Sequence, residues 1–310
     1  MRIDRMTLAH ARRALREARH HLYDPNVTLI DFGHGQVGGQ CVEDKLAIRF
    51  HVRRKLTPLA LEAAVEARRT ADVPGSIGGF PTDVIQGTFH PHRGWWTTWS
   101  RPRAETRADR RDPMKGGISI SDERHNAYGT LGGLVADRAT GARMILSNWH
   151  VLAAEWNARV GQRIYQPGRL DGGTSADTVA SLARDAMGAD LDAAVATLNG
   201  SRRLVAEQVD LGAVRGVGRA ELGMELAKSG RRTGVTFGVV RGVEGVANLT
   251  YGFVGRVIRK VVTIEPRSAV EEVSAGGDSG SLERCPRTRP ERVRRRRSSS
   301  PASWTIPTSG

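Results

Sequence analysis

Three short segments carry residue types that together could perform acyl transfer. His150 follows the apolar run Ile145–Leu146, Asp192 precedes the apolar run Ala193–Ala196, and Ser279 lies in a glycine-rich turn. A serine hydroxyl becomes a strong nucleophile when an imidazole takes its proton and a carboxylate holds that imidazole. The chain therefore offers a candidate His, Asp and Ser set, in that order, with separations of 42 and 87 residues.

The turn around Ser279 is the sharpest of the three signals. It reads Gly276–Gly277–Asp278–Ser279–Gly280–Ser281. Acyl transfer needs an exposed hydroxyl and backbone amides turned toward the developing oxyanion. Gly277 can adopt the backbone angles that point amides inward, and Gly280 leaves room for the scissile peptide. Asp278 could form an ion pair with a cation or remain a solvated loop carboxylate.

The acid of the set has two candidates. Asp190 and Asp192 both stand before the apolar run, where aspartates are also common turn formers. We prefer Asp192, because the small apolar residues that follow it would anchor its carboxylate beside the core. A histidine placed like His150 is, taken alone, more often a packed or solvated imidazole.

The second half of the chain predicts the elements that would position these groups. From Gly129 onward, short Val-, Ile- and Leu-rich runs alternate with glycine, which is typical of strands at barrel-like spacing. We therefore expect a mainly β domain at 129–282.

The first 90 residues predict a different kind of unit. Residues 1–25 contain helical spacing of apolar residues opposite a basic face, and residues 26–90 predict a small α/β lobe. In that lobe two strands form a hairpin, with Ile48 and Phe50 on its apolar face and Arg49 and His51 facing away. A short helix follows, with Pro58 in its first turn.

Residues 91–128 have no sustained period and read as a basic linker. The aromatic residues Trp95, Trp96 and Trp99 could stack nucleic-acid bases, but a hydrophobic anchor on a neighbouring domain is the preferred interpretation.

The motifs resemble those of a known superfamily. GTLGGLVAD, ILSNWHVLA, LDAAVATL, KSGRRTGVTFG and GGDSGSL are similar to segments of the chymotrypsin-like serine peptidases, and more closely to the trypsin-like peptidases related to the plant Narrow Leaf proteins. The resemblance covers roughly 129–282. It implies a chymotrypsin-like double β-barrel with a catalytic triad of His150, Asp192 and Ser279.

The resemblance also implies the finer parts of the site. The amides of Gly277 and Ser279 would form the oxyanion hole. Val273 would lie near the base of the specificity pocket, where it supplies no charge and so disfavours selection for Arg or Lys side chains. The expected substrate is a polypeptide, with no metal ion and no organic cofactor.

Composition limits the other function classes. The formal net charge is +14, of which residues 283–310 contribute +6 through eight Arg against two Glu. Clustered cations favour nucleic acid. The remaining excess is scattered, except for an Arg-rich patch between Arg93 and Lys115, and this distribution disfavours such a partner. Only Cys41 and Cys285 are present, too few for a disulfide framework. The absence of a continuous apolar stretch predicts no membrane association and a cytoplasmic location.

The segment 283–310 departs from the pattern of the resemblance. It is rich in Arg, Ser and Pro and shows no apolar alternation, so it reads as a disordered tail or, in our preferred hypothesis, as out-of-frame translation. The C-terminal end of the resemblance is thus interpreted as frameshifted or truncated. If the tail is native as written, we expect an incomplete second barrel, which puts the activity of this chain in doubt. The alternative function is a non-catalytic double barrel retained for binding or assembly.

Overall fold

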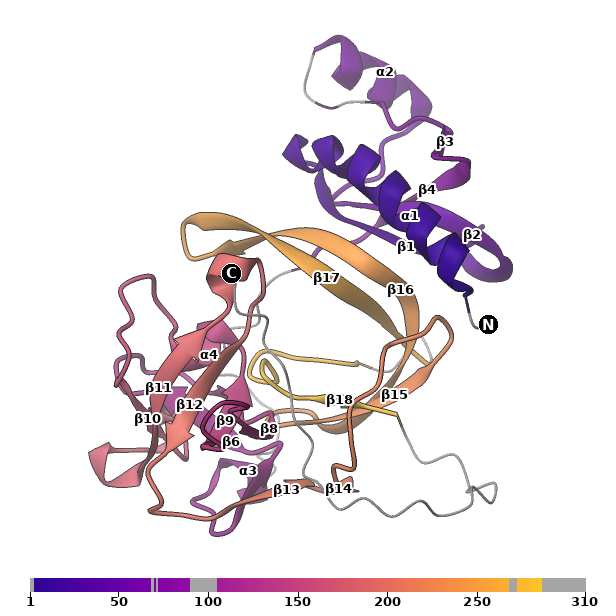
Figure 1. Ribbon diagram of the computed structural model, residues 1–310. Coiled ribbons are helices and arrows are strands. Elements are labelled where there is room, and N and C mark those ends of the chain that lie inside the picture. The colour runs from indigo at the N-terminus through magenta and orange to yellow at the C-terminus, as the bar shows by residue number, and fades with distance from the viewer. Residues whose placement is uncertain (1–2, 68–69, 71, 90–104, 268–271, 286–310) are drawn as a thin grey trace, which may run out of the picture. The chain divides into compact units, whose positions relative to one another are not determined.

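The computed structural model describes residues 3–67, 70, 72–89, 105–267 and 272–285 (Figure 1). The chain forms two compact units. Unit 1 comprises Met1–Pro91, Ala220–Met224 and Val239–Glu265, and unit 2 comprises His92–Arg219, Glu225–Gly238 and Pro266–Gly310. Strands predominate and the sheets are curled, which confirms the expected mainly β fold class. The five domain boundaries expected from the sequence stay a prediction.

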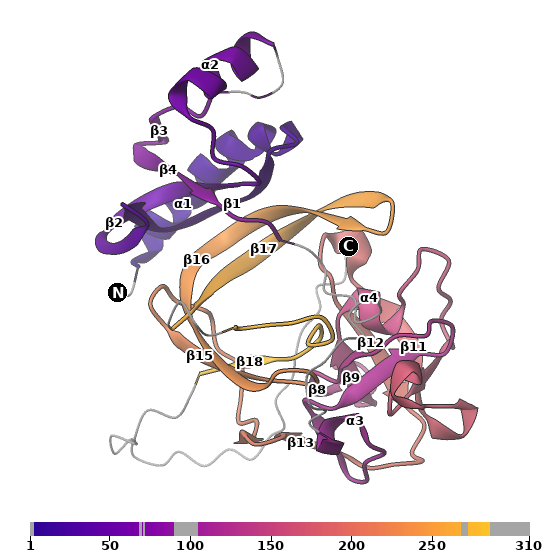
Figure 2. The same ribbon diagram turned by 180° about the vertical axis from the view of Figure 1, so that it is seen from behind.

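A seven-stranded sheet forms the centre of unit 2. Its spatial order is β7-β6-β10-β11-β12-β9-β8. The strands are β6 (Ser119–Asp122), β7 (Gly129–Thr130), β8 (Gly133–Ala136), β9 (Arg143–Ser147), β10 (Arg163–Tyr165), β11 (Thr178–Asp185) and β12 (Ala194–Leu198). Figure 2 shows the group of strands from behind.

This sheet closes on itself as a barrel. The two outermost strands, β7 and β8, are separated in the chain only by Leu131 and Gly132, which holds the two edges together. The Leu131 amide donates to Ile118 O beside β6, and the Gly132 amide donates to Leu146 O in β9. Apolar side chains fill the core, including Ile118, Ile120, Leu131, Ile145, Ile164, Val179 and Leu182. A closed barrel has no exposed sheet edge, so its wall is a rigid support for a site.

The region expected to be a linker contains regular structure. Residues 105–122 include α3 (Glu105–Ala108), β5 (Met114–Gly116) and β6, and β6 is a wall strand of the barrel. Strands of three and four residues are too short for a period to be recognised, which is why the sequence did not reveal them. Trp95, Trp96 and Trp99 lie outside the described residues.

The remaining elements of unit 2 are short. A three-stranded sheet contains β5, β13 (Leu204–Gln208) and β14 (Gly212–Ala213), with β5 parallel to β13. β15 (Glu225–Gly230) pairs with β18 (Glu283–Arg284) on one side and with the long strand β16 (Gly234–Tyr251) on the other. The single-turn helix α4 (Trp149–Leu152) follows β9. Residues 286–310, the expected aberrant tail, lie outside the described residues.

Unit 1 is a sheet covered by a helix. The predicted hairpin is present as β1 (Val27–Val37) and β2 (Gln40–Val52), which turn at Gly38 and Gly39, both with positive φ. β2 pairs in parallel with β4 (Phe80–Gln86), which pairs with β3 (Ser76–Ile77). β1 also pairs with β16 (Gly234–Tyr251), and β16 pairs with β17 (Val254–Pro266).

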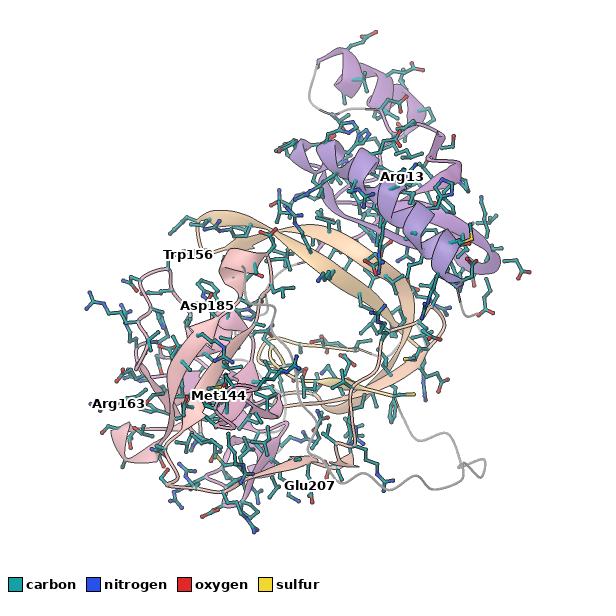
Figure 3. The ribbon with its side chains drawn as sticks, viewed as in Figure 1. Arg13, Met144, Trp156, Arg163, Asp185 and Glu207 are labelled. Carbon is teal, nitrogen blue, oxygen red and sulfur yellow. The ribbon has the colours of Figure 1, made fainter. Side chains whose placement is uncertain are left out.

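Two helices of unit 1 match the sequence prediction. The amphipathic helix α1 (Arg5–Ala18) buries Ala11, Ala14 and Leu15 and continues into a 3-10 turn at Arg19–Tyr23, while Arg13 on its other face is exposed (Figure 3). α2 (Pro58–Glu66) begins at the expected proline. None of the described helices combines the length and the apolar character that crossing a bilayer requires.

One expectation for the hairpin is wrong. Arg49 and His51 were expected to face away from the core, yet both are buried. Arg49 donates to both carboxylate oxygens of Asp31, at 2.7 and 2.6 Å, and to Thr263 Oγ1 at 2.6 Å. Strand alternation distinguishes two faces of a sheet, but here both faces are covered, so the polar residues satisfy one another instead of water.

Candidate active site

His150 and Asp192 are brought together by the pairing of two barrel strands. Ala194 at the start of β12 lies opposite Ser147 at the end of β9, so the residues just outside each strand end are neighbours. The His150 Nδ1 and Asp192 Oδ2 atoms are 2.6 Å apart, and the His150 amide donates to Asp192 Oδ1 at 3.2 Å. Asn148 Nδ2 donates to Asp192 O at 2.6 Å. The carboxylate is thus held by backbone and side chain at once.

This contact sets the tautomer of His150. An ionised carboxylate can only accept hydrogen bonds, so the neutral ring carries its proton on Nδ1 and its lone pair on Nε2. The side chains of His150 and Asp192 are 4% and 13% exposed. In so dry a place the pair is weakly screened, which strengthens the orientation of the ring.

Asp190 has a different position. It has a left-handed conformation, with φ of 60°, at the end of the 3-10 turn Met187–Ala189. Asp192 makes both contacts with His150 described above, one to its ring and one to its amide. The sequence argument for Asp192 depended on the apolar strand that follows it, and β12 is that strand.

Apolar packing fixes the helical turn that carries His150. Trp149 and Leu152 are buried, and the Trp149 ring lies against Trp156, with ring centroids 4.5 Å apart. Trp156, labelled in Figure 3, follows α4 and is 43% exposed. A β-carbon at Gly129 would lie 2.5 Å from Val151 Cγ2, so α4 is packed directly on β7.

The turn with Ser279 lies against the same part of the barrel. The Ser279 carbonyl accepts from the Thr130 amide at 2.7 Å. Gly280 has a φ of 96°, and a β-carbon there would lie 2.0 Å from Ser147 Oγ. Ser147 is three residues before His150. The turn therefore rests on β7 and on the end of β9, the strand that leads to His150.

Gly277 is required by both conformation and space. Its φ is 107°, and a β-carbon there would lie 2.1 Å from Tyr128 Cε2. A side chain at this position would be strained and would collide with the tyrosine ring. The sequence argument for this glycine relied on its backbone angles alone, and the close contact with Tyr128 adds a second reason.

Hydrogen bonds fix the direction of the Ser279 amide. The Asp278 carbonyl, in the same peptide plane, accepts from the Ser281 amide at 3.0 Å and from Ser281 Oγ at 2.7 Å. In a trans peptide the N–H points opposite to the C=O. The Ser279 N–H is therefore directed away from Ser281 and from the interior of the turn.

Asp278 is a buried structural anion, not a solvated loop carboxylate. It is 1% exposed, and its Oδ2 lies 3.0 Å from Lys228 Nζ. Thr233 Oγ1 donates to Oδ2 at 2.6 Å, and the amides of Arg232 and Ala275 donate at 2.8 and 3.0 Å. Burial raises the pKa of Asp278, but Lys228 and these hydrogen bonds outweigh it and hold that pKa below its usual value.

Lys228 is a site residue that sequence reasoning missed. It is 2% exposed and lies 50 residues before Asp278, so no local pattern links the two. The sequence did contain one indication. Lys228 lies within a predicted strand, and a lysine that is buried in a strand needs an acidic partner.

Val273 is half-buried, and its carbonyl accepts from Thr236 Oγ1 at 2.7 Å. This bond fixes the bend at Val273, before the turn. The role of Val273 in a specificity pocket stays a prediction. Within the described ranges, His, Cys, Asp and Glu side chains form no group of three or more that could hold a metal ion.

Comparison with known proteins gave matches among solved structures alone. No protein-family profile and no curated protein matches the chain. Cellulomonas bogoriensis chymotrypsin is 18% identical with a TM-score of 0.39, and Thermobifida fusca protease A is 15% identical with a TM-score of 0.40; each match covers 56% of this chain and 79% of the other. A glutamic acid-specific serine protease that uses a histidine triad in substrate binding is 22% identical with a TM-score of 0.40, over 55% and 79% of the two chains. The fold described above rests on the strand order and closure of this chain itself.

Proposed function

We propose that this chain is a serine endopeptidase in which His150, Asp192 and Ser279 form the catalytic triad. The observation that carries the proposal is the double contact of Asp192 with the ring and the amide of His150. It is the arrangement that makes Nε2 a base. The position of the Ser279 turn against Ser147 and Thr130 supports it.

The reaction follows from the chemistry of these groups. His150 Nε2 takes the proton of the Ser279 hydroxyl as Ser279 Oγ attacks the carbonyl carbon of the scissile peptide. Asp192 stabilises the imidazolium, which then gives its proton to the leaving amine as the C–N bond breaks. Water, activated by the same ring, attacks the acyl-enzyme and releases the acid.

The amides of Gly277 and Ser279 receive the negative charge of the tetrahedral intermediate. Support comes from the outward direction of the Ser279 N–H and from the positive φ of Gly277. Such donors act strongly because they are already oriented when charge develops. Val273 forms the uncharged floor of the specificity pocket, which favours apolar over basic side chains.

The finer assignments belong to the same proposal. The motifs ILSNWHVLA and GGDSGSL support the closer likeness to Narrow Leaf-type peptidases and their bacterial relatives. The proposed reaction uses no metal ion or organic cofactor, because the triad supplies both the nucleophile and the base. The proposed substrate is a polypeptide, and the proposed location of this protein is the cytoplasm.

Replacing Ser279 by Ala tests the proposal. We expect the wild-type chain to hydrolyse peptide esters and to be labelled at Ser279 by a fluorophosphonate probe, and Ser279→Ala to lose both, with kcat falling about 10⁶-fold. Ser201→Ala is the matched control, since it removes an exposed serine hydroxyl of unit 2 that donates to Thr178 O and is not part of this turn. Peptide mass spectrometry of the labelled chain identifies the modified residue.

One outcome of this labelling experiment would reject the proposed function. A folded wild-type chain that is neither labelled at Ser279 nor active would reject the peptidase assignment and favour a non-catalytic double barrel that binds or assembles.

A further inference from the structure

Arg231 is largely buried, although it lies in the basic, glycine-rich segment Lys228–Gly234. Its side chain is 11% exposed. Arg231 Nε donates to Asp171 Oδ2 at 2.8 Å, and Nη2 pairs with Asp171 Oδ1. The guanidinium carbon also lies 3.9 Å from the centroid of the Tyr128 ring. A two-point ion pair with a ring stacked on the guanidinium allows the arginine one orientation.

Asp171, the partner of Arg231, is fixed to the barrel wall. Its side chain is 3% exposed, and its Oδ2 accepts from Ser119 Oγ at 2.6 Å. Ser119 begins β6, and its hydroxyl in turn accepts from the Gly168 amide at 3.0 Å. The ion pair therefore has a rigid support, and the position of residue 231 is fixed relative to the barrel.

Thr130 connects Arg231 to the turn that carries Ser279. The Arg231 amide donates to Thr130 Oγ1 at 2.9 Å, and Thr130 Oγ1 donates to Gly277 O at 2.8 Å. A hydroxyl has one proton. Because the Arg231 amide occupies a lone pair of that oxygen, the proton is free to point at Gly277 O.

Thr130 and Tyr128 hold the turn at several points. The Thr130 amide donates to Ser279 O at 2.7 Å, so one residue binds the carbonyls of both Gly277 and Ser279. The Tyr128 ring, pressed on Gly277 from the side, is held by the same guanidinium. Arg231 thus supports the turn at two points, through the Thr130 hydroxyl and through the Tyr128 ring.

We infer that Arg231 and Thr130 are positioning residues that hold the Gly277–Ser279 backbone in the orientation that binds an oxyanion. The inference rests on the proposed peptidase function. Neither side chain needs to touch the substrate, because each acts through the backbone of the turn. The carbonyls of Gly277 and Ser279, which Thr130 binds, lie in peptide planes that adjoin the planes of the Gly277 and Ser279 amides. Their contribution appears in the transition state, where the oxyanion exists, and hardly in the binding of the ground state.

Thr130→Val is the sharpest test, because it keeps the shape of the side chain and removes both hydroxyl bonds. Complete loss of one oxyanion donor lowers kcat about 10²- to 10³-fold, so loosening the turn should lower kcat about 10- to 100-fold. We expect KM for a peptide ester to stay within about threefold and Ki for a peptide boronic acid, which forms a tetrahedral adduct, to rise in proportion to the loss of kcat.

Two controls separate this effect from loss of folding. Thr130→Ser retains the hydroxyl and should stay within about threefold of wild type. Thr178→Val removes another hydroxyl of unit 2, one that donates to Ser175 O at 2.7 Å, and should leave kcat and Ki unchanged. Thermal unfolding of each variant reports its folded fraction, by which kcat is corrected.

Arg231→Met tests the other half of the inference. It keeps the backbone amide and much of the side-chain volume but removes the ion pair and the stacked cation. We expect the same pattern of lower kcat, near-constant KM and higher boronate Ki, with partial recovery in Arg231→Lys. Wild-type values in Arg231→Met would limit the positioning role to Thr130 and overturn the assignment of Arg231.

The outcomes also distinguish this inference from the proposal on which it rests. If the wild-type chain is labelled at Ser279 and Thr130→Val has wild-type kcat and boronate Ki, the positioning inference is wrong and the peptidase assignment stands. If the wild-type chain is not labelled at Ser279, both fail. A loss of kcat that disappears after correction for folded fraction also overturns the inference.

Discussion

Two buried aspartates, one in each unit, have nearly the same hydrogen-bond and ion-pair partners but stabilise different parts of the backbone. Asp31 of unit 1 is 0% exposed and binds Arg49 and Thr263. Asp278 of unit 2 is 1% exposed and binds Lys228 and Thr233. Each therefore pairs a carboxylate with a buried cation and a threonine hydroxyl.

The two sites differ in what the carboxylate is attached to. Asp31 lies in the middle of β1 and ties that strand to β2 and β17. Asp278 lies in a turn and precedes the candidate nucleophile, so its contacts fix the backbone of Ser279. Burial and ion pairing alone therefore do not identify a functional site. What distinguishes Asp278 from Asp31 is that the backbone it immobilises carries the candidate nucleophile.

The largest effect on stability is expected at Asp31. Removing one member of a buried ion pair leaves the other charge uncompensated, so Asp31→Ala should lower the free energy of unfolding by about 3–5 kcal/mol. Denaturant unfolding measures this, and kcat per folded molecule should stay within about twofold. The control is Glu244→Gln, which breaks the exposed pair with Arg12 and should cost about 1 kcal/mol or less.

Acid should reveal the same pair in the wild-type chain. Burial raises the pKa of Asp31, but the hydrogen bonds and charge of Arg49 outweigh it and bring that pKa to about 2. A carboxyl with a lowered pKa in the folded state stabilises the fold above its unfolded pKa, and that contribution is lost as pH falls toward 2. If Asp31→Ala lowered the free energy of unfolding by no more than Glu244→Gln does, this account of the buried pair would be wrong.

A smaller effect on stability, with a larger one on catalysis, is expected at Lys228. Asp278 would keep the hydrogen bonds from Thr233 Oγ1 and from two backbone amides, so Lys228→Met should lower the free energy of unfolding by only about 1–3 kcal/mol. Because the turn loses its ion pair, kcat should fall about tenfold. Adding Asp278→Asn removes the unpaired charge, keeps hydrogen-bonding capacity and should restore part of the stability. Ester hydrolysis corrected for folded fraction is the measurement. If Lys228→Met changed stability without changing kcat, the ion pair of Asp278 would be purely structural, as that of Asp31 is.

The smallest effect is expected at His125, whose side chain is 24% exposed. Its ring lies 2.8 Å from Asp122 Oδ1 and 2.7 Å from Glu155 Oε1. The hydrogen bond to Asp122 outweighs burial and, with Glu155, raises the pKa of His125. A raised folded pKa gives stability that is complete below the unfolded pKa and is lost as pH rises through the folded value.

His125→Gln should therefore destabilise the chain by about 1 kcal/mol or less at about pH 6 and by less at about pH 9. Melting temperatures at the two pH values test the sign. A variant that is more damaging at the alkaline pH would show that the pair is not ionic.

The sequence predicted what depends on local pattern. Pro58 marked the start of α2, and the glycines around Ser279 marked a turn that needs positive φ at Gly277 and Gly280. The choice of Asp192 over Asp190 was also local, because it followed from the strand after it. These features depend on neighbours in the chain, so periodicity and turn chemistry are enough.

The sequence could not predict partners that only the tertiary fold brings together. Arg49 alternates with apolar residues as a solvent-facing residue would, and nothing nearby reveals that the second face of its sheet is covered. Arg231 lies in a basic, glycine-rich stretch typical of surfaces, and its partner Asp171 is 60 residues away. Charged residues that pair across such distances look, in sequence, like solvated ones.

The pairing of β1 with β16 has a consequence for how this protein is made. Leu29 and Ile30 lie opposite Ala247 and Val246, which the ribosome adds more than 200 residues later. Until then one edge of the nascent N-terminal sheet has no neighbour, and an open apolar edge invites pairing with other chains. During synthesis this chain is therefore exposed to aggregation through the open edge of β1 for longer than a domain made of one continuous segment would be.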